Sequence, residues 1–315
     1  VAQQVTSDCR PWEGTSCLAV CRKCATVQKP VTAAWRRQID EIYAHYAVYA
    51  QGGGVEQVAF DQQTGAGVAR SQKIVDWLRG NGGLADTGCL LDIGCGNGAF
   101  LRAFGRVHPR WTMAGLELDA RNRMQVEAIE GVTHLHVGPI DSMAARHDLV
   151  VLIHALEHIP NPVSYLRSLR GLLKDHGCLL VQVPDLVSSP FDILIADHCS
   201  HFDAVSLRRV LELSDFEVLR LEAGGSVAKE LTLLARPVSA QLAVEPGVRI
   251  SDEQNAASMH IAWLHRMLDQ GRSAKGSIGI FGTSISATWL AAALGDRVGF
   301  FVDEDTHRIG RRHMG

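Results

Sequence analysis

From Cys89 onward, short apolar runs alternate with segments of helical periodicity. The predicted strands are CLLDI (89–93), WTMAGLEL (111–118), GVTHLHV (131–137), HDLVVLIHAL (147–156) and CLLVQVP (178–184). The helices predicted between them are AFLRAFGRV (99–107), ARNRMQVEAI (120–129) and PVSYLRSLRGLL (162–173). This alternation is typical of a parallel sheet with helices on both faces. The chain is therefore predicted to be an α/β protein.

The end of this alternation departs from the parallel pattern. A helix is predicted at 204–214, and two apolar strands follow at 216–223 and 229–236. Only the short turn GGSVA separates these strands, so they should pair antiparallel. A parallel sheet that ends in an antiparallel hairpin is a narrower pattern than a plain Rossmann fold.

The flanking segments carry weaker patterns. Helices are predicted at 32–50, at about 66–80 and at about 255–270, and a strand–turn–helix–strand unit at 277–305, while 237–258 is predicted to be a linker. One βαβ unit cannot bury its own faces. We therefore expect the C-terminal α/β segment to be incomplete or to pack against another part of the protein. The predicted domains are 1–60 (cysteine-bearing and helical), 61–237 (cofactor-binding) and 238–315 (C-terminal segment).

The strongest chemical signal is the glycine-rich segment LLDIGCGNGAF at 90–100, which follows a strand–loop–helix pattern. Gly94, Gly96 and Gly98 allow the backbone to turn tightly and to approach a ligand closely. The helix that follows directs its N-terminus to the same place. The segment therefore predicts a nucleotide-like ligand at this loop.

Two acids narrow the identity of that ligand. Asp92 ends the first strand, and Glu117 ends the next one, where an acid can bind a ribose diol. A NAD site would place a pyrophosphate at the loop, and Asp92 would repel it. The cationic methionine end of S-adenosylmethionine would instead be attracted. We therefore predict S-adenosylmethionine as the cofactor.

Together with GLELD and LIHALEHIPNP, this segment resembles a class I S-adenosylmethionine-dependent methyltransferase over roughly 66–237. The resemblance implies a seven-stranded Rossmann-like sheet of order 3-2-1-4-5-7-6, with strand 7 antiparallel. Many relatives carry an acid where Pro139 stands, so Ile140 and Asp141 are both candidates for the adenine contact. The implied cofactor-binding residues are Asp92, Gly94, Cys95, Gly96, Asn97, Gly98, Glu117, Leu118, Ile140 and His154.

The flanks resemble a narrower subset with a zinc-binding N-terminal region and a C-terminal domain, which includes C-methyltransferases of nucleotide-linked deoxysugars. CLAVCRKCATVQ (17–28) resembles its second zinc knuckle, with Cys21 and Cys24 as the ligand pair. A Cys-x-x-Cys turn presents two thiolates to one tetrahedral metal, which needs four ligands. The candidates for the others are Cys9 and Cys17, or a first pair that precedes Val1. The alternative is that these cysteines are reduced thiols without a metal.

The segment PFDILIADHCSHFD at 190–203 is crowded with acids and histidines. In the sugar C-methyltransferases that the chain resembles, a Tyr-His-Glu-His segment here supplies the base, and this chain has Ile-Ala-Asp-His at 195–198. We predict His198, assisted by Asp197, as the general base. His158, before the IPNP turn, is a further candidate catalytic residue. The alternatives are that His198 fixes the loop and that His158 bonds the turn.

Composition adds few restrictions. Of 315 residues, 46% are hydrophobic and 21% charged, and the net charge of −3 gives no electrostatic argument for nucleic acid or a membrane surface. No apolar run reaches the ~18–20 residues that span a bilayer. The cysteine usage indicates a reducing, cytoplasmic context. We expect a small-molecule acceptor, such as the carbon or hydroxyl of a nucleotide-linked sugar, and leave a homo-oligomer open.

Two other functions stay open at this point. A non-catalytic partner subunit would keep the fold without the chemistry, and the altered Tyr-His-Glu-His segment favours it. A NAD(P)-dependent oxidoreductase could use either glycine loop, because GIFGTS (279–284) is followed by a strand that ends at Asp303.

Overall fold

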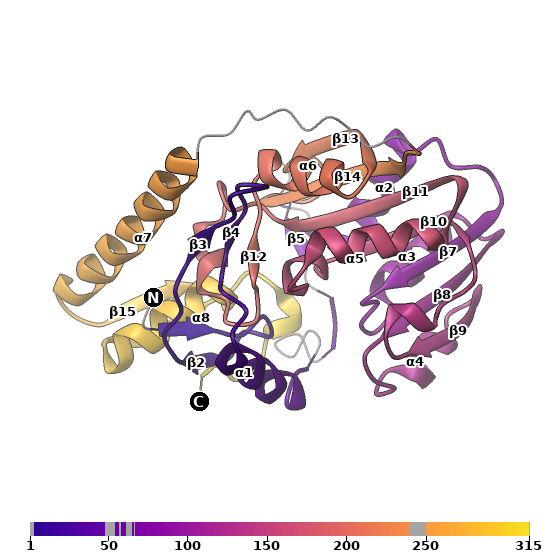
Figure 1. Cartoon of the computed structure of the whole chain (residues 1–315). Helices are drawn as coiled ribbons and strands as arrows, with labels where there is room; N and C mark the ends of the chain where they lie inside the picture. The colour runs from indigo at the N-terminus through magenta and orange to yellow at the C-terminus, as the bar shows by residue number, and fades with distance from the viewer. Residues whose placement is uncertain are drawn as a thin grey trace. The chain divides into compact units, whose positions relative to one another are not determined.

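The computed structural model describes residues 3–47, 54–56, 58–60, 65, 67–239 and 250–314 (Figure 1). The chain divides into two compact units. The first unit comprises Val1–Gln57, Ser189–His201 and Gly247–Gly315, and the second comprises Val58–Ser188 and Phe202–Pro246. Each unit is therefore assembled from stretches that are separate in the sequence.

The second unit is built around one large sheet. Its strands are β7 (Gly88–Ile93), β8 (Trp111–Glu117), β9 (Val132–Val137), β10 (His147–Ile153), β11 (Leu173–Pro184), β13 (Phe216–Ala223) and β14 (Glu230–Pro237). Its helices are α2 (Arg70–Asn81), α3 (Ala99–Val107), α4 (Arg123–Glu127), α5 (Pro162–Leu169) and α6 (Ala204–Leu213). Shorter elements are β5 (Val58–Phe60), β6 (Gly67–Ala69), η2 (Ile140–Ser142), η3 (Leu156–His158) and η4 (Arg170–Leu172).

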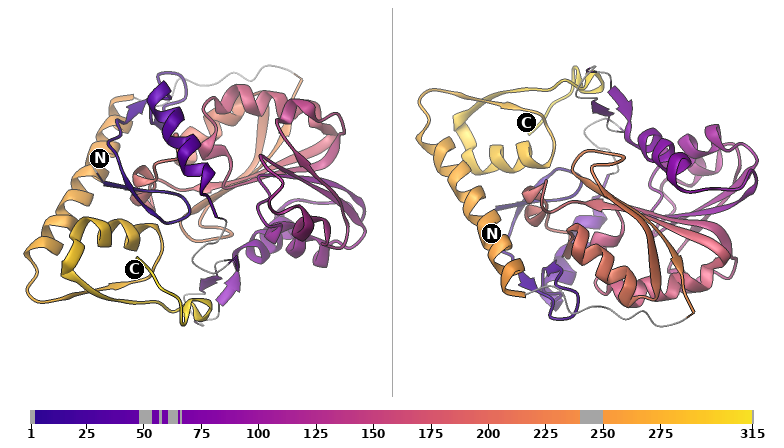
Figure 2. Two further views of the ribbon diagram at one scale, coloured as in Figure 1. Left: turned by 90° about the horizontal axis from the view of Figure 1, so that it is seen from below. Right: turned by 90° about the horizontal axis from the view of Figure 1, so that it is seen from above.

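The sheet has seven strands in the order β9-β8-β7-β10-β11-β14-β13. The neighbours from β9 to β11 are parallel, whereas β14 is antiparallel to both β11 and β13. Helices α2 and α3 cover one face, and α5 and α6 cover the other (Figure 2). The prediction of an α/β protein with a mostly parallel seven-stranded sheet is thus confirmed.

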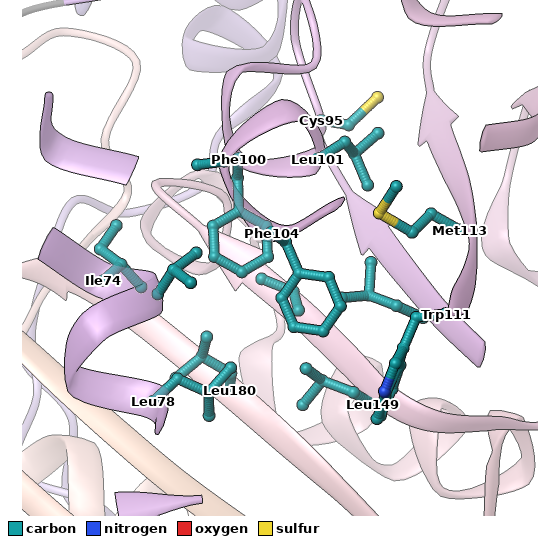
Figure 3. Packing of buried hydrophobic residues seen from close by; sticks show 14 of the residues in the cluster. Ile74, Leu78, Cys95, Phe100, Leu101, Phe104, Trp111, Met113, Leu149 and Leu180 are labelled. Carbon is teal, nitrogen blue, oxygen red and sulfur yellow. The ribbon is translucent and has the colours of Figure 1, made fainter. Parts of the chain in front are cut away.

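The core of this unit lies between the sheet and the α2–α3 face. Phe100 and Phe104 of α3 pack with Ile74 of α2 and with Trp111 and Met113 of β8 (Figure 3). The Phe104 and Trp111 rings meet edge to face with centroids 5.3 Å apart, a geometry that aromatic pairs favour. Because α3 is anchored in this way, the loop that joins β7 to α3 is attached to rigid elements at both ends.

Several predicted boundaries were wrong. The helix predicted at about 66–80 begins at Arg70, because 67–69 form β6 and pair with β5; Ala66 lies outside the described residues. The helix predicted at 120–129 is limited to α4, and β11 begins five residues before the predicted strand at 178. The register of β11 against β10 is irregular where it begins.

The first unit consists of short strands, α-helices and 3₁₀ helices. Its strands are β1 (Gln3–Val5), β2 (Pro11–Glu13), β3 (Ala19–Val20), β4 (Val27–Gln28), β12 (Ser200–His201), β15 (Ile278–Phe281) and β16 (Val298–Val302). Its α-helices are α1 (Ala33–Ala44), α7 (Ile250–Ser273) and α8 (Ile285–Leu294), and its 3₁₀ helices are η5 (Pro190–Leu194), η6 (Gly295–Arg297) and η7 (Thr306–Arg308). The predicted linker at 237–258 was too long, because α7 already begins at Ile250.

The C-terminal strand–helix–strand segment packs against the N-terminal residues of its own unit. Helix α8 contacts β1 and β2, and α7 contacts β3 and β4. One face of the β15–β16 pair packs on α8 through Ile280, Ala287 and Ala291. Within the described ranges, no helix has both the length and the apolar character needed to cross a bilayer.

Candidate functional site

The loop between β7 and α3 has the conformation for which its glycines are needed. Gly94, Gly96 and Gly98 have φ values of +73°, +56° and +79°, which residues with a side chain rarely adopt. A Cβ on Gly98 would also lie 2.4 Å from Cδ1 of Ile129. The Gly98 N–H donates to the Cys95 carbonyl at 2.9 Å and closes the turn at the start of α3. The predicted glycine loop is therefore a tight turn.

Two carboxyl groups lie at the base of this loop. Asp92, near the end of β7, is only 2% exposed. Glu117 ends β8, and its Oε1 accepts a 2.6 Å hydrogen bond from the Gly96 N–H. Burial, together with the charge of Glu117, raises the pKa of Asp92 to about 8, and burial also raises the pKa of Glu117. A bound cation would favour the ionised forms of both acids.

Buried neighbours support the loop from beneath. Cys95 lies so close to β8 that a Cβ on Gly115 would be 2.6 Å from its Sγ. Burial raises the pKa of the Cys95 thiol, so this cysteine is not an activated nucleophile. Arg102 donates to the Asn97 carbonyl at 2.8 Å. The sequence analysis did not single out Gly115 or Arg102, and no local motif marks either of them.

The cofactor-binding candidates Leu118, Ile140 and Asp141 lie on two different segments. Leu118 directly follows Glu117 and is 73% exposed. Ile140 begins η2, and with Asp141 it lines a cavity of about 430 Å³ that also includes Arg146 and Ser168. Their contact with a cofactor stays a prediction.

His154 occupies the exit of β10 in a left-handed conformation, with a φ of +51°. Its Nδ1 lies 3.1 Å from Glu157 Oε1 and its Nε2 lies 3.2 Å from Glu230 Oε2. Arg70 bonds Glu230 at 2.6 Å and also lies 2.5 Å from His154 Nε2. Burial would lower the pKa of His154, but the charge of Glu230 and the bonds to both carboxylates raise it to about 9. A protonated ring cannot accept from Arg70, so Glu230 is the partner that both cations share.

This charged network borders the glycine loop, because a Cβ on Gly94 would lie 3.3 Å from the Cβ of Ala155, the residue after His154. His158 ends η3, and its N–H donates to the Ala155 carbonyl at 3.2 Å. This backbone bond belongs to the turn. A cofactor contact by His154 and a catalytic role of His158 stay predictions.

In the first unit, the carboxylate bonded to His198 is not the one predicted. His198 Nδ1 lies 2.7 Å from Asp192 Oδ1, and His201 Nδ1 lies 2.6 Å from Asp192 Oδ2. Asp197 instead accepts from the backbone N–H of Ser7 at 2.9 Å and from its hydroxyl at 2.5 Å. Asp192 is therefore the carboxylate that bonds Nδ1 of His198, and a catalytic role of Asp197 beside His198 stays a prediction.

The local backbone explains this pairing. The Ile195 N–H bonds the Asp192 carbonyl at 3.0 Å, and the His198 N–H bonds the Ile195 carbonyl at 3.3 Å. These two turns fold the chain back after η5, which ends at Leu194, and the His198 ring reaches Asp192. His198 follows Asp192 by six positions and His201 follows His198 by three, which is no recognised motif, so the sequence offered no clear signal for this pair.

The Asp192 cluster, defined here as Asp192, His198 and His201, is fully buried. Lys29 lies beside it, and its Nζ donates to the Ile195 carbonyl. Burial lowers the pKa of Lys29 to about 8, against the charges of Asp192 and Asp197. Burial would raise the pKa of Asp192, but the two imidazoles outweigh it and lower this pKa. Asp192 is therefore ionised at neutral pH.

The predicted zinc ligands do not fit a tetrahedral site. Cys24 is buried with its Sγ 3.1 Å from Thr26 Oγ1, and burial raises its pKa. Cys9 is half-buried, and desolvation raises its pKa to about 12, whereas Cys17 is exposed. In the described part of the chain, Cys21 and Cys24 belong to no group of three or more His, Cys, Asp and Glu side chains with ligand atoms within 4.8 Å of one another.

The second glycine loop is closed by its own side chains. Asp303 Oδ2 accepts from Thr283 Oγ1 at 2.6 Å and from Arg308 Nη1 at 2.9 Å. The carboxylate that the oxidoreductase alternative requires for a ribose is thus bonded within the protein.

Comparison with known proteins places the second unit in a family. Residues 69–221 match the family described as "Methyltransferase domain". C-methyltransferase NovU of Streptomyces niveus is 26% identical over 242 residues, which cover 73% of this chain and 53% of that protein. A ubiquinone biosynthesis O-methyltransferase of Xanthomonas campestris pv. campestris is 25% identical over 112 residues, or 34% of this chain and 47% of that protein. The chain thus spans about half the length of these relatives.

Solved structures with a similar fold include CalO1, a methyltransferase in calicheamicin biosynthesis, with a TM-score of 0.45, 21% identity and coverage of 54% of each chain. The mitomycin 7-O-methyltransferase MmcR has a TM-score of 0.47 and 16% identity, covering 54% of this chain and 53% of its own. From the family match and the curated relatives, residues 69–221 are a class I S-adenosylmethionine-dependent methyltransferase domain.

Proposed function

We propose that the whole chain transfers a methyl group from S-adenosylmethionine to a carbon or hydroxyl of a small molecule, with a nucleotide-linked sugar as the acceptor. The observation that carries the proposal is the pair of buried Asp92 and half-buried Glu117 at the glycine loop, with Glu117 bonded to Gly96. Two desolvated acids favour a cationic ligand, and the methyl donor carries a sulfonium and an ammonium. The similarity to C-methyltransferase NovU supports carbon as the acceptor atom.

The chemistry assigns a defined task to the protein. Methyl transfer breaks the bond from sulfur to the methyl carbon and forms a new bond to the acceptor. The sulfonium is already activated, so the enzyme aligns the acceptor and removes its proton. A carbon beside a carbonyl must lose its proton to become nucleophilic. We assign this proton to Nε2 of His198, because its Nδ1 is bonded to Asp192.

The test is His198→Ala. Loss of a general base should lower turnover by ~10²–10⁴-fold, whereas the affinity for S-adenosylmethionine should stay unchanged because no residue of the glycine loop is altered. Turnover is measured as S-adenosylhomocysteine formation with a panel of nucleotide-linked keto-deoxysugars and phenols, and affinity by isothermal titration calorimetry. His45→Ala, at an exposed histidine of the same unit, is the matched control and should keep full turnover.

Two outcomes would contradict the proposal. Unchanged turnover in His198→Ala would remove this residue from the mechanism. Tight cofactor binding by the wild-type protein without methylation of any member of a broad panel would favour the non-catalytic partner subunit.

A further inference from the structure

We infer that Asp192 is a positioning residue that sets the tautomer of His198 and is itself held by His201. This inference rests on the proposed function, because it names the group that prepares the proposed base. It assigns the role of orienting carboxylate to Asp192 and leaves Asp197 with a bond to Ser7.

The hydrogen-bond geometry fixes the direction of both bonds. Each oxygen of Asp192 meets one Nδ1, at 2.7 Å for His198 and 2.6 Å for His201. An ionised carboxylate can only accept, so both rings must donate from Nδ1. The lone pair of a neutral ring then lies on Nε2. Asp192 thereby makes Nε2 the basic atom of His198.

His201 completes the arrangement as a second arm. Its ring is 1% exposed, and within the described residues its Nε2 has no hydrogen-bond partner. The ring of His201 therefore acts through its hydrogen bond from Nδ1 to Oδ2 of Asp192. By holding Oδ2, His201 prevents rotation of the carboxylate and keeps Oδ1 directed at His198.

Burial makes the arrangement sensitive to the chemistry at position 192. All three residues are at most 3% exposed, so water cannot replace a lost partner. Burial lowers the pKa of His201, and the charge of Lys29, which also acts on this cluster, lowers it further; Asp197 in turn acts on Lys29. An asparagine at 192 would offer one oxygen and one NH₂ to the two rings. One ring would then have to accept at Nδ1 and carry its proton on Nε2, where it could no longer act as a base.

The experiment is Asp192→Asn, read by activity and by NMR of ¹⁵N-histidine-labelled protein, in which the ring nitrogens report the tautomer. We expect turnover to fall by ~10²-fold, at the lower end of the range for a general base, with unchanged affinity for S-adenosylmethionine. An Nε2–H imidazole should appear that wild-type protein lacks. Because both residues act as one unit, Asp192→Asn/His198→Ala should turn over as slowly as His198→Ala alone.

The matched control is Asp8→Asn. Asp8 is a buried carboxylate of the same unit and is bonded to Thr6 and Arg10. This variant should keep both the ring tautomers and the turnover of the wild type. Should Asp192→Asn fail to fold, Asp192→Glu retains an acceptor, and both rings should keep Nδ1–H. An Nε2–H form of His198 in Asp192→Glu would overturn the inference.

The two readouts separate this inference from the proposed function. A tautomer change in Asp192→Asn supports the positioning role even if no acceptor is ever methylated, in which case the proposed function alone fails. Wild-type tautomers of both His198 and His201 in Asp192→Asn, or a change caused by Asp197→Asn instead, would overturn the inference while leaving the proposed function intact.

Discussion

Among the described residues, the acids at the glycine loop and the Asp192 cluster are built in opposite ways. At the glycine loop of the second unit, burial and the charge of another acid, Glu117, raise the pKa of Asp92 to about 8. In the first unit, Asp192 lies between two imidazoles and its pKa is lowered. A bound cation would stabilise the two acids at the glycine loop, whereas the charge of Asp192 is already compensated by two imidazoles of the protein.

This difference indicates that one group is prepared for binding and the other for orienting a side chain. A buried acid beside a second, half-buried acid costs folding free energy until a positive ligand arrives, so the acid pair is suited to binding. A carboxylate held by two donors is complete without a ligand, so the Asp192 cluster is suited to orienting a side chain. Changing the charge at each site, or the pH of the solution, tests this difference.

The largest effect in this comparison should come from Asp92→Asn. Removal of the negative charge should weaken S-adenosylmethionine binding by ~10–100-fold, because an electrostatic interaction that shifts a pKa by about one to two units changes an affinity by the same factor. The same change removes repulsion from Glu117, so the ligand-free protein should be more stable than wild type at pH 8. Calorimetric titration and thermal unfolding measure the two effects.

The sign of the stability change follows from linkage. The folded protein keeps Asp92 protonated up to a pKa of about 8, whereas the unfolded chain ionises it near pH 4. Wild-type stability from this group therefore falls as pH rises from about 4 to 8, and Asn lacks this loss. Asp86→Asn, at an exposed carboxylate, is the control and should change neither quantity. A lower stability of Asp92→Asn than of the wild type at pH 8 would contradict the repulsion between Asp92 and Glu117.

A smaller effect is expected from pH alone. Binding of a cation requires ionised Asp92, so the affinity for S-adenosylmethionine should rise between pH 6.5 and 8, by at most about tenfold per pH unit below the pKa. S-adenosylhomocysteine lacks the sulfonium charge and should show a weaker rise. Titrations of both ligands across this range measure the difference. The same slope in wild type and Asp92→Asn would assign the titration to another group.

Features that depend on residues close together in the sequence could be predicted. The loop from Asp92 to Gly98 is a continuous motif, and long apolar runs such as β10 and β11 identified the sheet strands. In the first unit, β15 and β16 match the predicted strand–turn–helix–strand unit, whereas β3, β4 and β12 were missed because they are two residues long, too short for a visible alternation. Their pairing depends on contacts between 27–28 and 200–201, which no local pattern reveals.

The same reason limits what could be predicted of the candidate site. Asp197 was predicted to assist His198 because it aligns with the Glu of the Tyr-His-Glu-His segment, and its carboxylate bonds Ser7, 190 positions away. Similarly, the partners of His154 come from Arg70 and Glu230, at the start of α2 and of β14. Side-chain partners set by packing of distant segments cannot be obtained from spacing along one segment.

The smallest effect should come from metal removal. Cys21 resembles a metal-binding thiol, because backbone N–H groups of Cys24 and Lys23 lower its pKa despite burial, yet Cys24 has a raised pKa and a hydroxyl neighbour. We expect purified protein to contain zinc far below one ion per chain and to keep its unfolding temperature in chelator, as measured by elemental analysis and thermal scans. Cys24→Ser should cost at most about 1 kcal/mol, the size of one hydrogen bond, and Cys17→Ser, at an exposed thiol, should cost nothing measurable. Stoichiometric zinc, together with a lower unfolding temperature in chelator, would contradict this expectation. Ligands beyond the described residues would then complete the site. The first unit would contain a second charge-compensated centre besides the Asp192 cluster.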